Sequence, residues 1–176
     1  MKLTAQTSTV IAGPRQDVFD YATNNDTYER RLNQAFGPVA GIAKAEMVEG
    51  HTLQTGALRN IHMKDGSVVA ETITEHNPPN CHQYEWTTGP KPPASWMVRR
   101  GIGTWNFSEV DGGTRVDWTY DFELRSPLAY PMALGMVAMF RRWMEKGLAS
   151  MRDGFVPVAS ASAQTTASQT EQRLQN

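Results

Sequence analysis

Residues 102–124 constrain the fold of this chain more than any other stretch. Two segments there alternate between apolar and polar residues, and Asp111-Gly112-Gly113 separates them. A period of two places the apolar side chains of each segment on one face of a β-strand. We therefore expect a β-hairpin with one broad aromatic face, which another element must cover. Its apolar positions are Trp105, Phe107, Val116, Trp118, Tyr120, Phe122 and Leu124.

The position of the turn decides which aromatic residues face each other. A two-residue turn at Gly112-Gly113 would place Phe107 opposite Trp118 and Trp105 opposite Tyr120. A turn at Asp111-Gly112 would also leave aromatic residues opposite apolar ones. Both registers keep the aromatic face intact.

The segment from Leu128 to about Phe155 is the expected cover for this face. Its apolar residues recur at steps of three and four, which is typical of one face of a helix. They are Met132, Met136, Phe140, Trp143, Gly147 and Met151. Such a helix can seal a solid core or form the roof of a cavity, and that choice decides whether a ligand can bind.

The rest of the chain predicts one strand, two short helices and a series of further strands. A strand is expected at Leu3–Ala12, a helix after Pro14, and a second helix that Asp26 or Thr27 caps and that ends at Leu32. Turn-forming residues separate the following strands. These strands are expected at about Ile42–Glu49, Ala57–Met63, Val68–His76 and His82–Thr88. We predict one domain over residues 1–157 and a disordered polar tail over residues 158–176.

Composition excludes several classes of function. The formal net charge of −1 and the pI near 6.4 give no electrostatic signature of binding to nucleic acid or to an anionic membrane. Cys81 is the only cysteine, which rules out an intrachain disulfide and favours a reducing compartment. The most apolar stretch, Leu128–Phe140, is too short to span a bilayer. We expect a soluble cytoplasmic protein without stable membrane insertion.

Several short signatures together resemble a known fold. They are Pro14–Tyr21 after the first strand, Gly56–Arg59 with Asp65-Gly66 and Glu71–Ile73, Gly112–Trp118, and the long closing helix. Over about residues 4–155 the chain resembles the START-like (SRPBCC) superfamily, and most closely its polyketide cyclase/dehydrase and lipid-transport branch. The resemblance implies an α+β helix-grip fold of β-α-α-β6-α order. In that fold a curved antiparallel sheet wraps around the last helix and encloses an apolar cavity.

Arg59 and Glu71 form the most suggestive polar pair. A three-residue loop at Lys64–Gly66 would place Ile61 opposite Val69 and Arg59 opposite Glu71, with both charges on the inward face. A guanidinium beside a carboxylate in a cavity can hold a ligand oxygen or orient a general base. The alternative is a salt bridge near the rim of a solid core. A two-residue loop would separate the pair altogether.

The expected cavity wall combines aromatic and adaptable methionine side chains. Tyr84 and Trp86 share one strand face and add a phenolic hydroxyl. Arg99 shares its strand phase with Gly101 and Gly103, so we expect it to point inward at the cavity mouth. The predicted ligand-binding residues are Ile61, Met63, Trp86, Arg99, Trp105, Phe107, Trp118, Tyr120, Met132, Met136, Phe140 and Trp143.

No other motif supplies a reactive site. Cys81 and His82 are adjacent on a strand, so their side chains point to opposite faces and cannot form a catalytic dyad. The four histidines lack the spacing of a zinc site, and the glycines do not spell a nucleotide-binding loop. We therefore predict neither a metal nor a cofactor.

Three functions remain open at this point. The first is a binding or carrier protein for a small hydrophobic or aromatic ligand, either a lipid or a polyketide-like molecule. The second is an aromatic polyketide cyclase or dehydratase, in which Arg59 polarises a carbonyl and Glu71 or Tyr84 moves the proton. The third is an interaction module whose loops at the cavity mouth dock a partner protein. The absence of an unambiguous acid/base set slightly favours the first.

Overall fold

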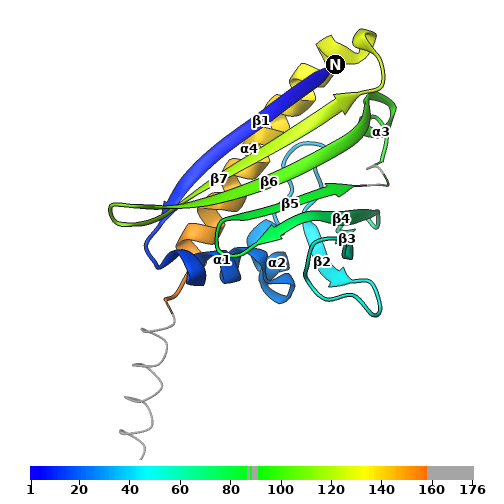
Figure 1. The fold of residues 1–176 in the computed structure, drawn as a ribbon. Coiled ribbons are helices and arrows are strands. Elements are labelled where there is room, and N and C mark those ends of the chain that lie inside the picture. The colour runs from blue at the N-terminus through cyan, green and yellow to red at the C-terminus, as the bar shows by residue number, and fades with distance from the viewer. Residues whose placement is uncertain (87, 89–90, 158–176) are drawn as a thin grey trace, which may run out of the picture.

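A computed structural model describes residues 1–86, 88 and 91–157; the predicted tail, 158–176, lies outside the described residues. One sheet, one long helix and a few short helices make up the domain (Figure 1). The strands are β1 (Lys2–Ile11), β2 (Ile42–Met47), β3 (Leu58–Met63), β4 (Val68–Asn77), β5 (Cys81–Trp86), β6 (Val98–Val110) and β7 (Gly113–Leu124). The helices are α1 (Arg15–Thr23), α2 (Asn25–Leu32), α3 (Ala94–Met97), the 3₁₀ turn η1 (Pro127–Ala129) and α4 (Tyr130–Gly154).

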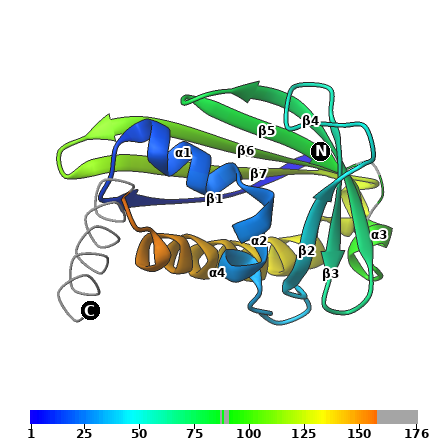
Figure 2. The ribbon, with the colours of Figure 1, turned by 90° about the horizontal axis from the view of Figure 1, so that it is seen from below.

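The strands form one antiparallel sheet in the order β1-β7-β6-β5-β4-β3-β2. Figure 2 shows the sheet turning from β1 toward β2 around α4, with α2 between α4 and β2. This arrangement confirms the predicted α+β helix-grip fold. In the part of the chain that the structure describes, no helix combines the length and apolarity needed to cross a bilayer.

The central hairpin, β6–β7, has the second of the two registers considered from the sequence. Trp105 lies opposite Trp118, and Phe107 lies opposite Val116. The turn is therefore Asp111-Gly112, and Gly112 takes the left-handed conformation, with φ of 88°, that glycine adopts without steric cost. Gly113 belongs to β7, where a Cβ atom would lie 2.2 Å from the carbonyl oxygen of Ile11. Gly112 thus allows the turn, and Gly113 allows β1 to approach β7 closely.

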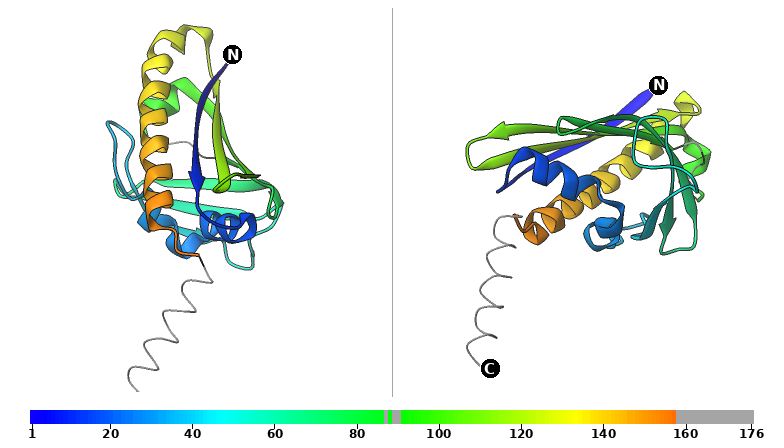
Figure 3. Two further views of the ribbon diagram at one scale, coloured as in Figure 1. Left: turned by 90° about the vertical axis from the view of Figure 1, so that its left-hand side faces the viewer. Right: turned by 60° about the horizontal axis from the view of Figure 1, so that its bottom comes forward.

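The two halves of α4 differ in what they cover. In the C-terminal half, Leu148 and Met151 are buried in the core, and Trp143, at the boundary between the two halves, packs on Trp118 with ring centroids 5.7 Å apart. A Cβ atom on Gly147 would come within 2.4 Å of Leu32, so glycine lets α2 approach the helix. Figure 3 shows α4 running along the inner side of the sheet beside β1. This half seals a solid core, whereas the N-terminal half does not.

The start of α2 differs from the prediction. Asn24 caps the helix, because its side-chain oxygen accepts a hydrogen bond of 2.8 Å from the backbone N–H of Asp26. Asn is among the most favourable N-cap residues. The predicted caps, Asp26 and Thr27, are instead part of the helix.

Candidate functional site

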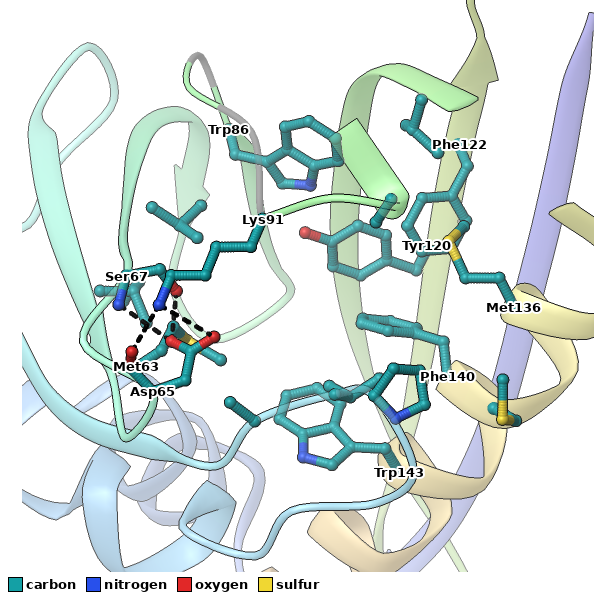
Figure 4. Close-up of a pocket in the computed structure, with 18 of the residues that line it drawn as sticks. Met63, Asp65, Ser67, Trp86, Lys91, Tyr120, Phe122, Met136, Phe140 and Trp143 are labelled. Carbon is teal, nitrogen blue, oxygen red and sulfur yellow. Dashed lines mark hydrogen bonds and ion pairs between the residues drawn. The ribbon is translucent and has the colours of Figure 1, made fainter. Parts of the chain in front are cut away.

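A pocket of about 460 Å³ lies between the N-terminal half of α4 and the concave face of the sheet. The helix contributes Met136 and Phe140, and the sheet contributes Tyr120 and Phe122 (Figure 4). At the opening, the β3–β4 loop and the segment before α3 complete the wall. The volume is within the range of ordinary small-molecule sites. The helix therefore seals a core at one end and roofs a pocket at the other.

Most of the predicted site residues line this pocket, and the wall is largely apolar. Tyr120 and Phe122 stack on each other and both contact Phe140, with ring centroids 4.8 and 5.1 Å away. The predicted residues that line the pocket are Ile61, Met63, Glu71, Tyr84, Trp86, Trp118, Tyr120, Met132, Met136, Phe140 and Trp143.

The Arg59–Glu71 pair is present and fully inside the domain. The three-residue loop gives the predicted register, with Arg59 opposite Glu71, and Gly66 has a φ of 80°. Arg59 donates from Nε and Nη2 to the same Glu71 oxygen, Oε2, at 3.0 and 2.6 Å. The two side chains are 0% and 7% exposed. An exposed salt bridge at the rim is therefore excluded.

Arg59 stands behind Glu71 and does not line the pocket, contrary to its predicted contact with a ligand carbonyl. Its third guanidinium nitrogen, Nη1, donates to Asn25 Oδ1 at 3.2 Å. The rings of Tyr28 and Tyr84 lie 5.0 and 5.3 Å from its guanidinium carbon. Because all three nitrogens have partners and two rings flank the cation, Arg59 positions Glu71 rather than a ligand.

Burial and the ion pair act in opposite directions on these two groups. Burial raises the pKa of Glu71, and Arg59 opposes that effect. Burial alone would lower the pKa of Arg59, but Glu71 and the neighbouring tyrosines raise it, so the guanidinium stays charged. The pKa of Glu71 thus lies above its ordinary value, which suits a group that accepts a proton.

Three tyrosine hydroxyls surround the carboxylate end of the pocket. Burial raises the pKa values of Tyr28, Tyr84 and Tyr120, and the charge of Glu71 adds to the rise for each. They therefore remain neutral hydroxyls near pH 7. Tyr84 also accepts a hydrogen bond of 3.3 Å from Trp105 Nε1. Apart from Asp65, Ser67 and Lys91 at the opening, the wall of the pocket is apolar up to this polar end.

Trp105 and Phe107 lie in the packed core beneath the pocket wall, contrary to the prediction that they bind a ligand. Trp105 is 1% exposed, packs on Trp118 with ring centroids 4.6 Å apart and reaches the pocket only through its bond to Tyr84. Phe107 packs on Phe19 of α1, with centroids 5.0 Å apart. The prediction that Trp105 and Phe107 share a strand face with the other aromatic residues was correct, but that face extends beyond the pocket.

The predicted inward direction of Arg99 is wrong. A β-bulge between Val98 and Arg100 interrupts the pairing of β6 with β7 and reverses the alternation on that side. Arg99 therefore points outward, with its side chain 67% exposed, and Nη2 lies 2.8 Å from Glu123 Oε2.

Sequence reasoning missed several residues that complete the site. Tyr28 and Asn25 come from α2, and only the packing of that helix brings them to Arg59. Lys91 lines the opening, where its ammonium lies 3.7 Å from Asp65 Oδ2 (Figure 4). No sequence spacing links α2 or residue 91 to the Arg59–Glu71 hairpin.

Metal-binding groups do not converge anywhere in the described part of the chain, since no three His, Cys, Asp or Glu side chains meet there. His76 and His82 come within 3.1 Å through their Nδ1 atoms, at the closed end near α1. Burial, with smaller effects of Arg59 and His76, lowers the pKa of His82 to about 2. Burial also lowers the pKa of His76, so both imidazoles are neutral at pH 7. His82 is buried in the core, whereas His76 is only partly buried.

Comparison with known proteins connects this architecture to one family. A family model described as polyketide cyclase / dehydrase and lipid transport matches residues 2–155. A solved protein of Nitrosospira multiformis is 20% identical, with a TM-score of 0.66 over 88% of this chain and 97% of that chain. No curated protein matches the sequence.

Two further solved structures show how widely the fold occurs. The di-domain ARO/CYC protein StfQ of the steffimycin biosynthetic pathway is 17% identical, with a TM-score of 0.61 over 87% of this chain and 50% of that chain. Major latex-like protein 151 of Panax ginseng is 12% identical, with a TM-score of 0.61 over 89% of this chain and 99% of that chain. At these identities the likeness concerns the fold alone.

Proposed function

The chain belongs to the polyketide cyclase/dehydrase and lipid-transport family, and we propose that it binds a small hydrophobic or aromatic molecule in the pocket under α4. The observation that carries this proposal is a pocket of about 460 Å³ with an apolar wall and one polar end. A few placed polar groups in an apolar pocket are typical of small-molecule sites, because the wall supplies affinity and the polar groups supply orientation.

Filling the pocket from Gly135 tests this proposal. Gly135 lines the pocket, and a Cβ atom built there meets no other atom within 4 Å. Gly135→Phe therefore adds a ring to the wall without displacing the backbone, and loss of a helical glycine stabilises α4 by up to about 1 kcal/mol. We expect calorimetry to show at least tenfold weaker binding of 2-naphthol than in the unchanged protein.

Two control variants separate pocket filling from other effects. Gly135→Ala raises helix propensity at least as much as Gly135→Phe but adds almost no volume, so it should retain 2-naphthol affinity. Leu134→Phe adds the same ring at a half-exposed neighbour that does not line the pocket. Unchanged affinity in Gly135→Phe, or equal losses in Gly135→Phe and Leu134→Phe, would contradict binding at this pocket.

A second candidate function is cyclisation of a polyketide-like chain in the same pocket. The observation that favours it is Glu71: both bonds from Arg59 go to Oε2, and among the described residues Oε1 accepts no hydrogen bond. Oε1 could take a proton from a carbon between two ketones, and a tyrosine hydroxyl could stabilise the enolate. The enolate carbon would then attack a second carbonyl carbon, so that one C–C bond forms and the carbonyl oxygen becomes an alkoxide, which takes the proton held by Glu71. Loss of the resulting hydroxyl with a neighbouring hydrogen would release one water.

Glu71→Gln distinguishes the catalytic candidate from simple binding. The amide keeps the shape of the carboxylate but cannot act as the base. With a soluble poly-β-ketone analogue, cyclisation followed by the growth of aromatic absorbance should have a kcat at least about 10²-fold lower in the variant, with a much smaller change in KM. Equal rates in the variant and the unchanged protein would remove Glu71 as the base.

A further inference from the structure

We propose that the polar end of the pocket selects neutral ligands that carry a hydroxyl donor, such as a phenol or an enol, and rejects carboxylates such as fatty acids. This inference rests on the proposed binding function and specifies its ligand class. It follows from three observations: Glu71 has one carboxylate oxygen that accepts no hydrogen bond from the described residues, Arg59 is enclosed by its own partners, and Lys91 lies at the opening of the pocket.

The polar end of the pocket presents a hydrogen-bond acceptor to a ligand. Glu71 lines the pocket, and its Oε1 accepts no hydrogen bond from the described residues, whereas Oε2 accepts two. A carboxylate oxygen is only an acceptor while the group is ionised. A ligand that reaches this end must therefore supply a donor, and a hydrogen bond to a charged acceptor is stronger than one between neutral groups.

The two charges at the polar end already balance each other. Arg59 and Glu71 form a buried pair with no net charge, and the guanidinium is bonded on every nitrogen and flanked by Tyr28 and Tyr84. A ligand carboxylate placed beside Glu71 would be a second buried anion, and no cation among the described residues there is free to pair with it. Burial of an unpaired charge is strongly unfavourable. The same guanidinium that holds Glu71 in place is thus unable to attract an acidic ligand.

The cation at the opening of the pocket already has a partner. Among the described residues, Lys91 is the one cation that lines the pocket, and it interacts with both the side chain and the backbone oxygen of Asp65 across the opening. Both side chains are about half exposed, so water screens Lys91. A carboxylate at the opening would gain little from this cation and would lie beside the Asp65 carboxylate.

Three tyrosine hydroxyls complete the polar end of the pocket. Tyr28, Tyr84 and Tyr120 line the pocket around Glu71 as neutral hydroxyls. Each hydroxyl can both donate and accept. A ligand phenol or enol has the same dual character, so it can donate to Glu71 and accept from a tyrosine. A ligand without a hydroxyl would leave the Glu71 oxygen without a partner in a desolvated site.

Three naphthalene probes of nearly equal size test the selection on the unchanged protein. At pH 7, 2-naphthol is a neutral donor, 2-methoxynaphthalene is neutral without a donor, and 2-naphthoate is an anion. Calorimetric titrations should show 2-naphthol binding about tenfold or more tightly than 2-methoxynaphthalene, because one hydrogen bond to a charged acceptor is lost. We expect 2-naphthoate to bind at least tenfold more weakly than 2-naphthol. No variant is needed, so a folding defect cannot obscure the result.

The outcomes separate this inference from the proposed function. Equal or tighter binding of 2-naphthoate than of 2-naphthol would overturn the selection, and so would equal affinities for 2-naphthol and 2-methoxynaphthalene. In both cases the pocket would still bind small aromatics, and Gly135→Phe would still weaken them. If none of the three probes bound, the proposed function and this inference would fall together. If 2-naphthol bound more tightly than the other two probes and Gly135→Phe abolished its binding, both the proposed function and the selection of hydroxyl donors would be supported.

Discussion

The buried ion pair gives the sharpest prediction for stability. Glu71→Gln keeps the volume of the side chain but leaves the Arg59 cation without an anion in a site where the two side chains are 0% and 7% exposed. Loss of one partner of a buried pair costs about 3–5 kcal/mol. The glutamine oxygen can still accept a hydrogen bond, and Asn25 and two tyrosine rings still contact the cation. We therefore expect a loss near the lower end, about 3 kcal/mol.

Urea unfolding followed by tryptophan fluorescence measures this loss as a change in midpoint at constant m value. Glu123→Gln is the matched control, because Glu123 pairs with an exposed arginine, Arg99, at 2.8 Å and should cost less than about 1 kcal/mol. Adding Arg59→Met to Glu71→Gln removes both charges and should recover part of the loss. Equal small losses in Glu71→Gln and Glu123→Gln would refute the burial argument.

Three further predictions concern the core, the site and the tail. The pKa of His82 is about 2 in the folded protein and 6.5 ordinarily, so between these two pH values only the unfolded state binds a proton there. The free energy of unfolding therefore falls as the pH decreases below about 6.5. His82→Phe should therefore reduce the slope of the unfolding free energy against pH between pH 6 and 4.5 by up to about 1.4 kcal/mol per pH unit, as urea unfolding at each pH would show. Gly103→Ala places a Cβ atom 2.4 Å from the Tyr84 ring, so urea unfolding should show a loss of about 1–3 kcal/mol in the free energy of unfolding. Because Tyr84 lines the pocket, calorimetry should also show weaker binding of 2-naphthol than in Gly135→Ala. Truncation after residue 157 should leave the Tm nearly unchanged, because residues 158–176 offer few apolar side chains to bury; a fall of several degrees would contradict the predicted boundary.

Turn rules in the sequence offered the correct pairing at the centre of the site as one of two possible registers. A three-residue loop at Lys64–Gly66 places Arg59 opposite Glu71, as in the structure, whereas the two-residue loop that the sequence also allowed would have separated them. The same kind of reasoning failed for Arg99, since a β-bulge adds a residue without a sequence signal. In the β6–β7 hairpin, two adjacent glycines left two possible turns, and the contact of Gly113 with β1 decided between them.

The functional meaning of the pair depended on tertiary packing, which spacing along the chain does not encode. Sequence reasoning assigned Arg59 to the ligand because a guanidinium in a cavity attracts oxygen atoms. In the structure, two residues of a helix more than thirty residues earlier take the places that a ligand would need. Asn25 accepts a hydrogen bond from the Arg59 guanidinium, and the Tyr28 ring covers one of its faces. The periodicity of α4 likewise predicted a single apolar face, but it could not predict that one half of this face packs and the other lines a pocket.

Methyl NMR of ¹³C-methionine-labelled protein tests most directly whether the pocket under α4 holds the ligand. Of the nine methionines, five line the pocket, and Met144 and Met151 are buried elsewhere in the core. The five are Met63, Met97, Met132, Met136 and Met139. Addition of 2-naphthol should shift these five methyl signals and leave those of Met144 and Met151 in place. Unshifted pocket methionines at saturating 2-naphthol, or shifts confined to Met144 and Met151, would contradict the proposed site.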